Sequence, residues 1–138
     1  MNEYTFDELS IGQKESFTKQ ITKEDILLFS KISGDKNPLH LDEEYAKATE
    51  FKKCVVFGML GSIMHSALAG MHLPGKYSLI LKEESSFISP IYLGDKLTII
   101  GEIVEKKEFG KLIFIETKIL NKDEKNIIRG KLVVKVLK

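Results

Sequence analysis

Polar and apolar residues in the first part of the chain predict a short leading segment followed by a strand. Residues 4–12 form the leading segment, with one short turn around Phe6–Leu9 and an end at Gly12. Side chains over Lys14–Ile21 then alternate loosely between polar and apolar, a pattern typical of a strand with one buried face. We therefore expect the first strand at Lys14–Ile21.

The next apolar residues recur at the spacing of a helix. We predict this helix from about Lys23 to Ser33. Its buried side is expected to carry Ile26, Phe29 and Ile32. Thr22 is suited to cap its start, and Asp25 stands where a capping box places its acidic partner. Gly34 has the backbone freedom of a C-terminal cap, so the helix should end there.

Two further helices follow. Asp42 precedes Glu43–Thr49, and an acidic cap with an acidic first turn favours a short helix because it complements the helix dipole. The stretch from Phe57 to about His72 is largely apolar and contains no carboxylate or lysine. A helix this apolar is expected to be buried on most of its surface. Leu73–Gly75 contains a proline and stops it.

The rest of the chain consists of runs rich in β-branched residues, separated by turn signals. The four predicted strands are Lys76–Ser89, Lys96–Glu108, Lys111–Asn121 and Asn126–Leu137. Their short connections favour an antiparallel meander. The third run is apolar on both faces in its first half, so we expect the outer face of the sheet to be covered. The pattern as a whole predicts an α+β fold, a curved antiparallel sheet around a long central helix.

Composition narrows the function classes. The chain has 138 residues, 43% hydrophobic and 30% charged, and we expect residues 1–138 to form one domain. A formal charge of +1, without a basic block interleaved with aromatics, argues against nucleic-acid binding. No apolar run approaches a membrane span, and Met1–Tyr4 lacks the features of a signal peptide. The single cysteine, Cys54, is expected to be a small core residue and fits a reducing cytoplasm.

The candidate chemistry lies in the loop Gly34–Asp42. Pro38 fixes its own φ, lacks an N–H and pushes Asn37 toward extended geometry, so we expect neither helix nor regular strand here. On such a stiffened turn the side chains of Asp35 and His40 can converge on one small molecule, which we expect to be water. A carboxylate and an imidazole held together in this way form an acid–base pair.

This loop and two later turns resemble those of the MaoC-like family, and within it the chain is most similar to the (R)-specific enoyl-CoA hydratases. The matching segments are SGDKNPLHLD at residues 33–42, Gly58-Met59-Leu60 and Leu73-Pro74-Gly75. The resemblance extends from about Ile11 to the C-terminus. It implies a hot-dog fold and a hydro-lyase that adds water reversibly to trans-2-enoyl thioesters. In the matching family members, the residues at Asp35 and His40 perform the acid–base catalysis, and we expect no cofactor.

Three more residues are predicted to contribute to the site. Gly58 begins the apolar helix, where unpaired amides and the positive dipole end favour an oxyanion, and we nominate its N–H as the donor. Ser66 matches a serine that lines the active site of the hydratases; the alternative is a helical serine that bonds back to a carbonyl. Asn37 is counted with the substrate-binding residues, although we expect it chiefly to shape the loop. At Phe57 the chain departs from many relatives, which have a histidine before the Gly-Met pair; this bears on acyl preference.

The remaining histidines and Asp42 have structural explanations. Asp42 serves as a helix cap, and we interpret His65 and His72 as structural or dimer-contact residues. Because no further histidine or cysteine stands at ligand spacing, we expect no metal site.

Three other functions stay open at this point. A hot-dog thioesterase needs a carboxylate on or near the central helix, which this helix lacks. An acyl-carrier-protein dehydratase usually combines a histidine with an acid on that helix, although an acyl-carrier-protein substrate remains possible for a MaoC-like enzyme. A non-catalytic acyl-CoA-binding subunit has no reason to keep both Asp35 and His40.

We also expect a homodimer. A single curved sheet around one helix leaves an edge strand exposed, and a partner usually extends or covers such an edge. The resemblance implies that each active site lies near the interface, with residues of both chains lining it. The acyl chain length and the pathway do not follow from the sequence.

Overall fold

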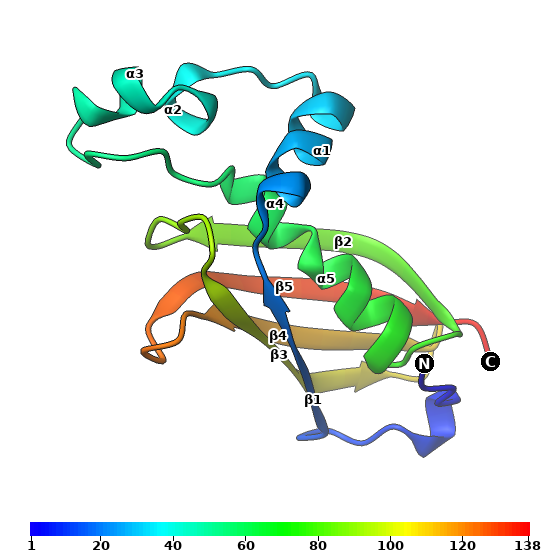
Figure 1. Ribbon diagram of the computed structural model, residues 1–138. Helices are drawn as coiled ribbons and strands as arrows, with labels where there is room; N and C mark the ends of the chain where they lie inside the picture. The colour runs from blue at the N-terminus through cyan, green and yellow to red at the C-terminus, as the bar shows by residue number, and fades with distance from the viewer.

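One antiparallel sheet forms the body of the protein, as the computed structural model of residues 1–138 shows (Figure 1). The strands are β1 (Lys14–Gln20), β2 (Ser78–Phe87), β3 (Lys96–Lys107), β4 (Leu112–Leu120) and β5 (Asn126–Val136). Their order across the sheet is β1-β3-β4-β5-β2. The sequence predicted all of these strands, and no boundary differs by more than two residues.

The expected meander is only partly correct. β3, β4 and β5 are consecutive neighbours, but β2 pairs with β5 at one edge and β1 pairs with β3 at the other. The connection from β2 to β3 crosses the end of the sheet, where backbone hydrogen bonds attach it to Ile127, Val56 and Ile21. These anchors are distant in sequence from the connection, so its local turn residues do not reveal the crossing.

The stretch predicted as one long helix winds through three consecutive segments. These are α4 (Gly58–Ser62), α5 (Met64–Ala67) and η2 (Leu68–His72), the last of which is a π-helix. Ile63, between the first two, has helical dihedral angles. The curved sheet lies along one side of this central helix (Figure 1), where buried side chains such as Leu60 and Leu68 join those of β3, β4 and β5 in the core. This arrangement is the hot-dog fold.

Two expectations about burial are wrong for the single chain. The central helix exposes an outer face, on which Met59, Ile63 and Met71 are 63%, 49% and 45% exposed, because the sheet covers one side only. No helix covers the outer face of the sheet either. Phe114 on that face is half-buried, with the ammonium of Lys107 lying 4.7 Å from its ring centroid.

The short helices lie together beyond one end of the sheet (Figure 1). They are α1 (Lys23–Ser33), α2 (Pro38–Leu41) and α3 (Glu43–Lys47), while a short turn, η1 (Phe6–Glu8), lies near the N-terminus. α1 has its predicted bounds, but only part of its predicted buried side is correct. Ile26 is buried and Phe29 half-buried, whereas Ile32 is 85% exposed because the last turn extends past the sheet. None of the helices has the length and apolarity needed to cross a membrane.

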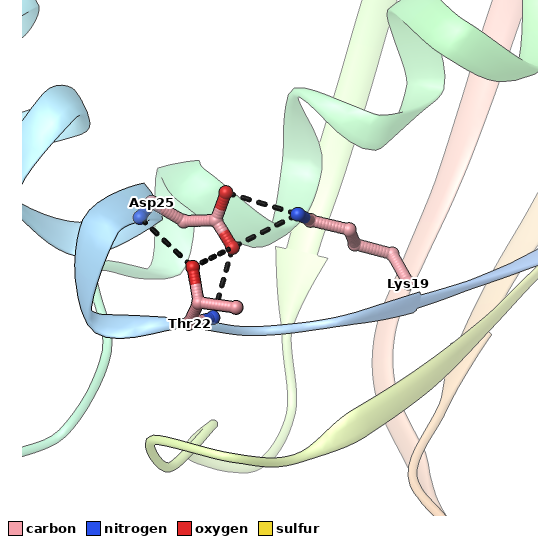
Figure 2. Close-up of polar contacts among 3 residues, drawn as sticks. All are labelled: Lys19, Thr22 and Asp25. Carbon is pink, nitrogen blue, oxygen red and sulfur yellow. Dashed lines mark hydrogen bonds and ion pairs between the residues drawn. The ribbon is translucent and has the colours of Figure 1, made fainter.

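The start of α1 is fixed by a capping box whose carboxylate also pairs with a lysine side chain (Figure 2). The Asp25 N–H donates to Thr22 Oγ1 at 3.2 Å, and the Thr22 N–H donates to Asp25 Oδ2 at 2.8 Å. Lys19 Nζ lies 2.9 Å from both carboxylate oxygens. Burial raises the pKa of Asp25, but the hydrogen bonds from Lys19 and Thr22 outweigh it and hold the pKa below its ordinary value. The end of β1 and the beginning of α1 are thereby held together.

Candidate active site

The loop between α1 and α3 contains a helical turn that the sequence analysis excluded. Gly34 ends α1 in the left-handed region, at φ 76°, and Pro38 opens α2. Proline is tolerated at the first helical position because the N–H that it lacks would have no intrahelical acceptor there. Asn37 caps this turn by accepting a hydrogen bond from the Leu39 N–H at 3.0 Å. Asn37 thus shapes the loop, and it lines neither of the cavities that contain both His40 and Gly58.

His40 lies on α2 with one ring nitrogen fixed by the backbone. Its Nδ1 is 2.8 Å from the carbonyl oxygen of Val55, which can only accept, so Nδ1 carries the hydrogen. In the neutral imidazole Nε2 is then the basic nitrogen, and no protein group binds it. The ring packs against Phe57 with their centroids 4.1 Å apart. The orientation and the tautomer of His40 are thus set before any substrate arrives.

Asp35 uses one carboxylate oxygen to shape the loop. Oδ1 accepts a hydrogen bond from the Asn37 N–H at 2.9 Å, and Ser30 Oγ donates to the Asp35 carbonyl at 2.7 Å. The side chain is exposed, and Oδ2 has no partner within the protein. The Asp35 carboxylate, like the His40 imidazole, is therefore fixed by a hydrogen bond at one polar atom. Its other polar atom is available to bind a ligand.

Both side chains border one cavity. Its volume is about 370 Å³, and its wall includes Asp35, His40, Gly58, Met59 and Phe87. A second cavity of about 350 Å³ shares His40, Gly58 and Phe87. It continues along apolar side chains that include Val55, Val56, Ile88, Ile91, Ile127 and Ile128. A polar group and an apolar tail of one ligand would thus find adjacent spaces that meet at His40.

Gly58 stands where the two cavities meet. It begins α4, so its N–H has no intrahelical acceptor, and Phe57 provides no side-chain cap. A β-carbon at position 58 would lie only 3.0 Å from the ring of Phe87, at the end of β2. Glycine therefore allows the close approach of this ring, whereas any side chain at position 58 would force the Phe87 ring to shift by a few tenths of an ångström.

The structure does not bring every predicted residue to this site. Ser66 is exposed on the outer face of α5, away from both cavities, on the same side of the central helix as Ile63. His72 stacks on Phe17, with centroids 4.9 Å apart, in agreement with its predicted structural role. Cys54 is only partly buried, so the prediction of a core residue is incorrect. Burial, followed by the neighbouring Glu43, raises the pKa of the Cys54 thiol, which disfavours the thiolate.

Two parts of the site were missed by the sequence analysis. Phe87 borders both cavities, but in the sequence it reads only as the end of a strand. The Val55 carbonyl that fixes His40 belongs to a segment without regular secondary structure and carries no side-chain signal. No group of three or more histidine, cysteine, aspartate or glutamate residues could hold a metal ion.

Comparisons with known proteins identify the family and the fold. The model of the MaoC like domain family matches residues 8–125. An (R)-specific enoyl-CoA hydratase of Aeromonas caviae is 34% identical over 128 residues, which cover 93% of this chain and 96% of the relative. A protein of the same name from Rhodospirillum rubrum is 37% identical over 74% of each chain. The unliganded R-hydratase PhaJ1 of Pseudomonas aeruginosa superposes with a TM-score of 0.90 at 34% identity, covering 96% of this chain and 84% of that one.

Proposed function

The chain belongs to the MaoC-like domain family, and from that membership we propose that it is an (R)-specific enoyl-CoA hydratase. The enzyme adds water reversibly across the double bond of trans-2-enoyl thioesters and releases (R)-3-hydroxyacyl products. The observation that carries this proposal is the convergence of Asp35, His40 and Gly58 on one cavity, in a chain so similar to named hydratases.

In this reaction Asp35 and His40 hold the attacking water between their available atoms, Oδ2 and Nε2. The water oxygen bonds to the β-carbon and loses one proton to the pair, and the pair returns one proton to the α-carbon. The sum of these steps is the addition of one water molecule. Positioned acid–base groups each contribute roughly 10²–10⁴-fold to such a rate. Asn37 supports the pair by holding the loop.

Negative charge develops on the thioester oxygen while the water attacks. The N–H of Gly58 is the proposed donor to this oxygen, because it is free of intrahelical bonds and lies beside the same cavity. The acyl chain then extends along the apolar second cavity. Phe57, which is 2% exposed and packs on His40, makes the rear of the site apolar.

The working form is proposed to be a homodimer in the cytoplasm, without a cofactor. The exposed apolar face of the central helix supports a second copy as its cover. Ser66 lies on that face, so its proposed role in substrate binding belongs to the assembled dimer. The thioester is carried by coenzyme A in our proposal, and an acyl-carrier-protein thioester is the second substrate to test.

A hydration assay tests the proposal directly. We expect the purified protein to hydrate crotonyl-CoA and to yield the (R)-3-hydroxy product, and a chain-length series then defines the acyl preference. Hydrolysis of acyl-CoA without hydration would instead identify a thioesterase. Binding of CoA esters with neither reaction, across C4 to C12 substrates, would identify a non-catalytic binding subunit.

A further inference from the structure

Besides His40, one other histidine forms hydrogen bonds through its ring. It is buried inside the fold, and both of its ring nitrogens have partners. His65 on α5 is 1% exposed, and its Nδ1 lies 2.9 Å from Oε1 of Glu83 on β2. Its Nε2 lies 2.8 Å from Oγ1 of Thr117 on β4. Because a carboxylate only accepts, Nδ1 carries a hydrogen, and the Thr117 hydroxyl completes the bonding of the ring. The central helix is thus connected by hydrogen bonds to two strands.

The sheet is shaped to receive this imidazole. At Gly130 on β5, between Thr117 and Ser85 in the strand register, a β-carbon would lie 2.7 Å from His65 Cε1 and 2.6 Å from Thr117 Oγ1. Ser85 also donates a hydrogen bond to Glu83. The order threonine, histidine, glutamate resembles a nucleophilic triad, but Thr117 is 2% exposed, so no substrate reaches its hydroxyl. The function of the cluster is therefore positional.

The strand on which Glu83 lies, β2, also contributes a residue to the wall of the candidate active site. β2 is an edge strand whose ladder pairs only with β5. Glu83, Ser85 and Phe87 alternate along it and share the face directed toward the central helix. Glu83 meets the helix at His65, and Phe87 meets it at Gly58, where its ring borders both cavities. Both contacts between β2 and the central helix therefore lie in the last part of the same strand.

We propose that His65 and Glu83 are positioning residues that hold the end of β2, and with it the ring of Phe87, against Gly58. This inference rests on the proposed hydratase function, in which the thioester lies beside Gly58. With Phe87 in place the thioester oxygen is directed to the Gly58 N–H. We call the hydrogen bond between His65 and Glu83 the tie. Without the tie the edge strand moves away from the helix, and the substrate binds with poorer alignment.

Kinetic constants for crotonyl-CoA hydration test the tie. Glu83→Ala should lower kcat by roughly 10- to 100-fold with KM changed far less, because misalignment of bound substrate reduces the rate of the chemical step. Glu83→Gln should restore most of the rate, since its amide oxygen can still accept from His65 Nδ1. The matched control is Glu84→Ala, the neighbouring glutamate, which pairs with Lys82 at the surface. Equal kinetics for Glu83→Ala and Glu84→Ala would overturn the proposal.

A double-mutant cycle shows whether Glu83 acts through Phe87. In a Phe87→Ala background, Glu83→Ala should lower kcat by less than threefold, because the ring that it positions is already absent. An undiminished 10- to 100-fold loss in that background would reject the proposed route and leave a general effect on folding. Thermal unfolding of each variant confirms that the assays are run on folded protein.

Hydrogen exchange separates this inference from the proposed function. The N–H groups of Ile88 and Ser89 donate to the Ile127 carbonyl at 2.8 and 3.3 Å, so these two amides report on the end of β2. They should exchange at least tenfold faster in Glu83→Ala than in wild type or Glu83→Gln. Unchanged exchange would overturn the tie even in an active hydratase. Faster exchange in a protein without hydratase activity would preserve the tie and reject the function.

Discussion

His40 is fixed through one nitrogen and, in the proposed reaction, works through the other. The Val55 carbonyl holds Nδ1, and Asp35 is held in the same way through Oδ1, so neither free atom has to be positioned by the substrate. That Asp35 and His40 border one cavity was predictable because the two residues lie close together on one stiffened turn. Phe87 and Ser66 were not, because their places depend on strand crossing and on which side of the helix the sheet covers.

Replacing either member of the acid–base pair should remove most turnover. We expect Asp35→Asn and His40→Gln each to lower kcat by roughly 10²–10⁴-fold, because each removes one proton-transferring group. Both positions are at least partly exposed, so the unfolding midpoint should change little. His72→Gln is the matched control, since that ring stacks on Phe17 outside the cavity. A variant of Asp35 or His40 with near-wild-type turnover would be removed from the mechanism.

A methyl group at Gly58 should also lower the rate. In Gly58→Ala the added carbon meets the ring of Phe87 at 3.0 Å, so that either the ring or the thioester is displaced. We expect kcat to fall on the order of 10²-fold, as for other small misplacements in active sites. Gly70→Ala is the control on the same central helix, because its β-carbon would meet only Ser78 Oγ, at 3.9 Å. Equal activity of the two variants would exclude a close approach of substrate at Gly58.

At the scale of elements, local signals set the boundaries and distant contacts set the neighbours. The bounds of α1 were predicted correctly because Thr22, Asp25 and Gly34 terminate it chemically at both ends. Strand positions followed from runs of β-branched residues. The pairing of β2 with β5 did not, because it depends on anchors such as Val56 and Ile127 that lie far along the chain. The helical turn α2 was missed because Pro38 was interpreted as a breaker rather than as a first helical residue.

The cap of α1 should contribute stability that depends on pH. The folded pKa of Asp25 is depressed, so its contribution is present above the ordinary carboxyl value of 3.8 and is lost as the pH falls through the lower folded pKa. Urea unfolding of wild type and Asp25→Asn at neutral pH and at successively lower pH measures this. The difference between the two proteins should shrink toward low pH, and a constant difference would contradict the assignment.

The threonine of the same cap can be tested at neutral pH alone. Thr22→Ala should lower the free energy of unfolding by about 1 kcal/mol, because the Asp25 N–H loses its acceptor. Thr49→Ala is a useful comparison, since that hydroxyl donates to the Ala46 carbonyl within a turn and caps no helix start. Equal losses of unfolding free energy in the two variants would show that the Thr22 hydroxyl stabilises the protein no more than the Thr49 hydroxyl does.

At the scale of the whole molecule, the chain leaves one apolar side uncovered. Met59, Ile63 and Met71 follow the outer face of the central helix and are 63%, 49% and 45% exposed. Exposed apolar surface of this extent beside an unpaired strand edge favours a partner. The sequence predicted the strand edge but not the helix face, because the apolar composition of the helix suggested burial on most of its surface.

A charge on that face should separate the proposed dimer. Ile63→Asp is expected to convert a homodimer into a monomer, because assembly would bury an unpaired carboxylate. Sedimentation velocity at micromolar concentration distinguishes the two states. Phe109→Asp is the control for a charge at an exposed apolar residue elsewhere, since Phe109 is 97% exposed at the turn between β3 and β4. A wild-type chain that sediments as a monomer would contradict the proposal.

Val55 contributes to the site with two different parts of itself. Its carbonyl holds the imidazole, while its side chain, 7% exposed, forms part of the apolar cavity wall. Every amino acid has the same carbonyl, so exchanging Val55 for another residue reshapes the space for the acyl tail and keeps the proton on Nδ1. Substrate preference can therefore diverge at this position during evolution, or be redesigned in the laboratory, without retuning the acid–base chemistry.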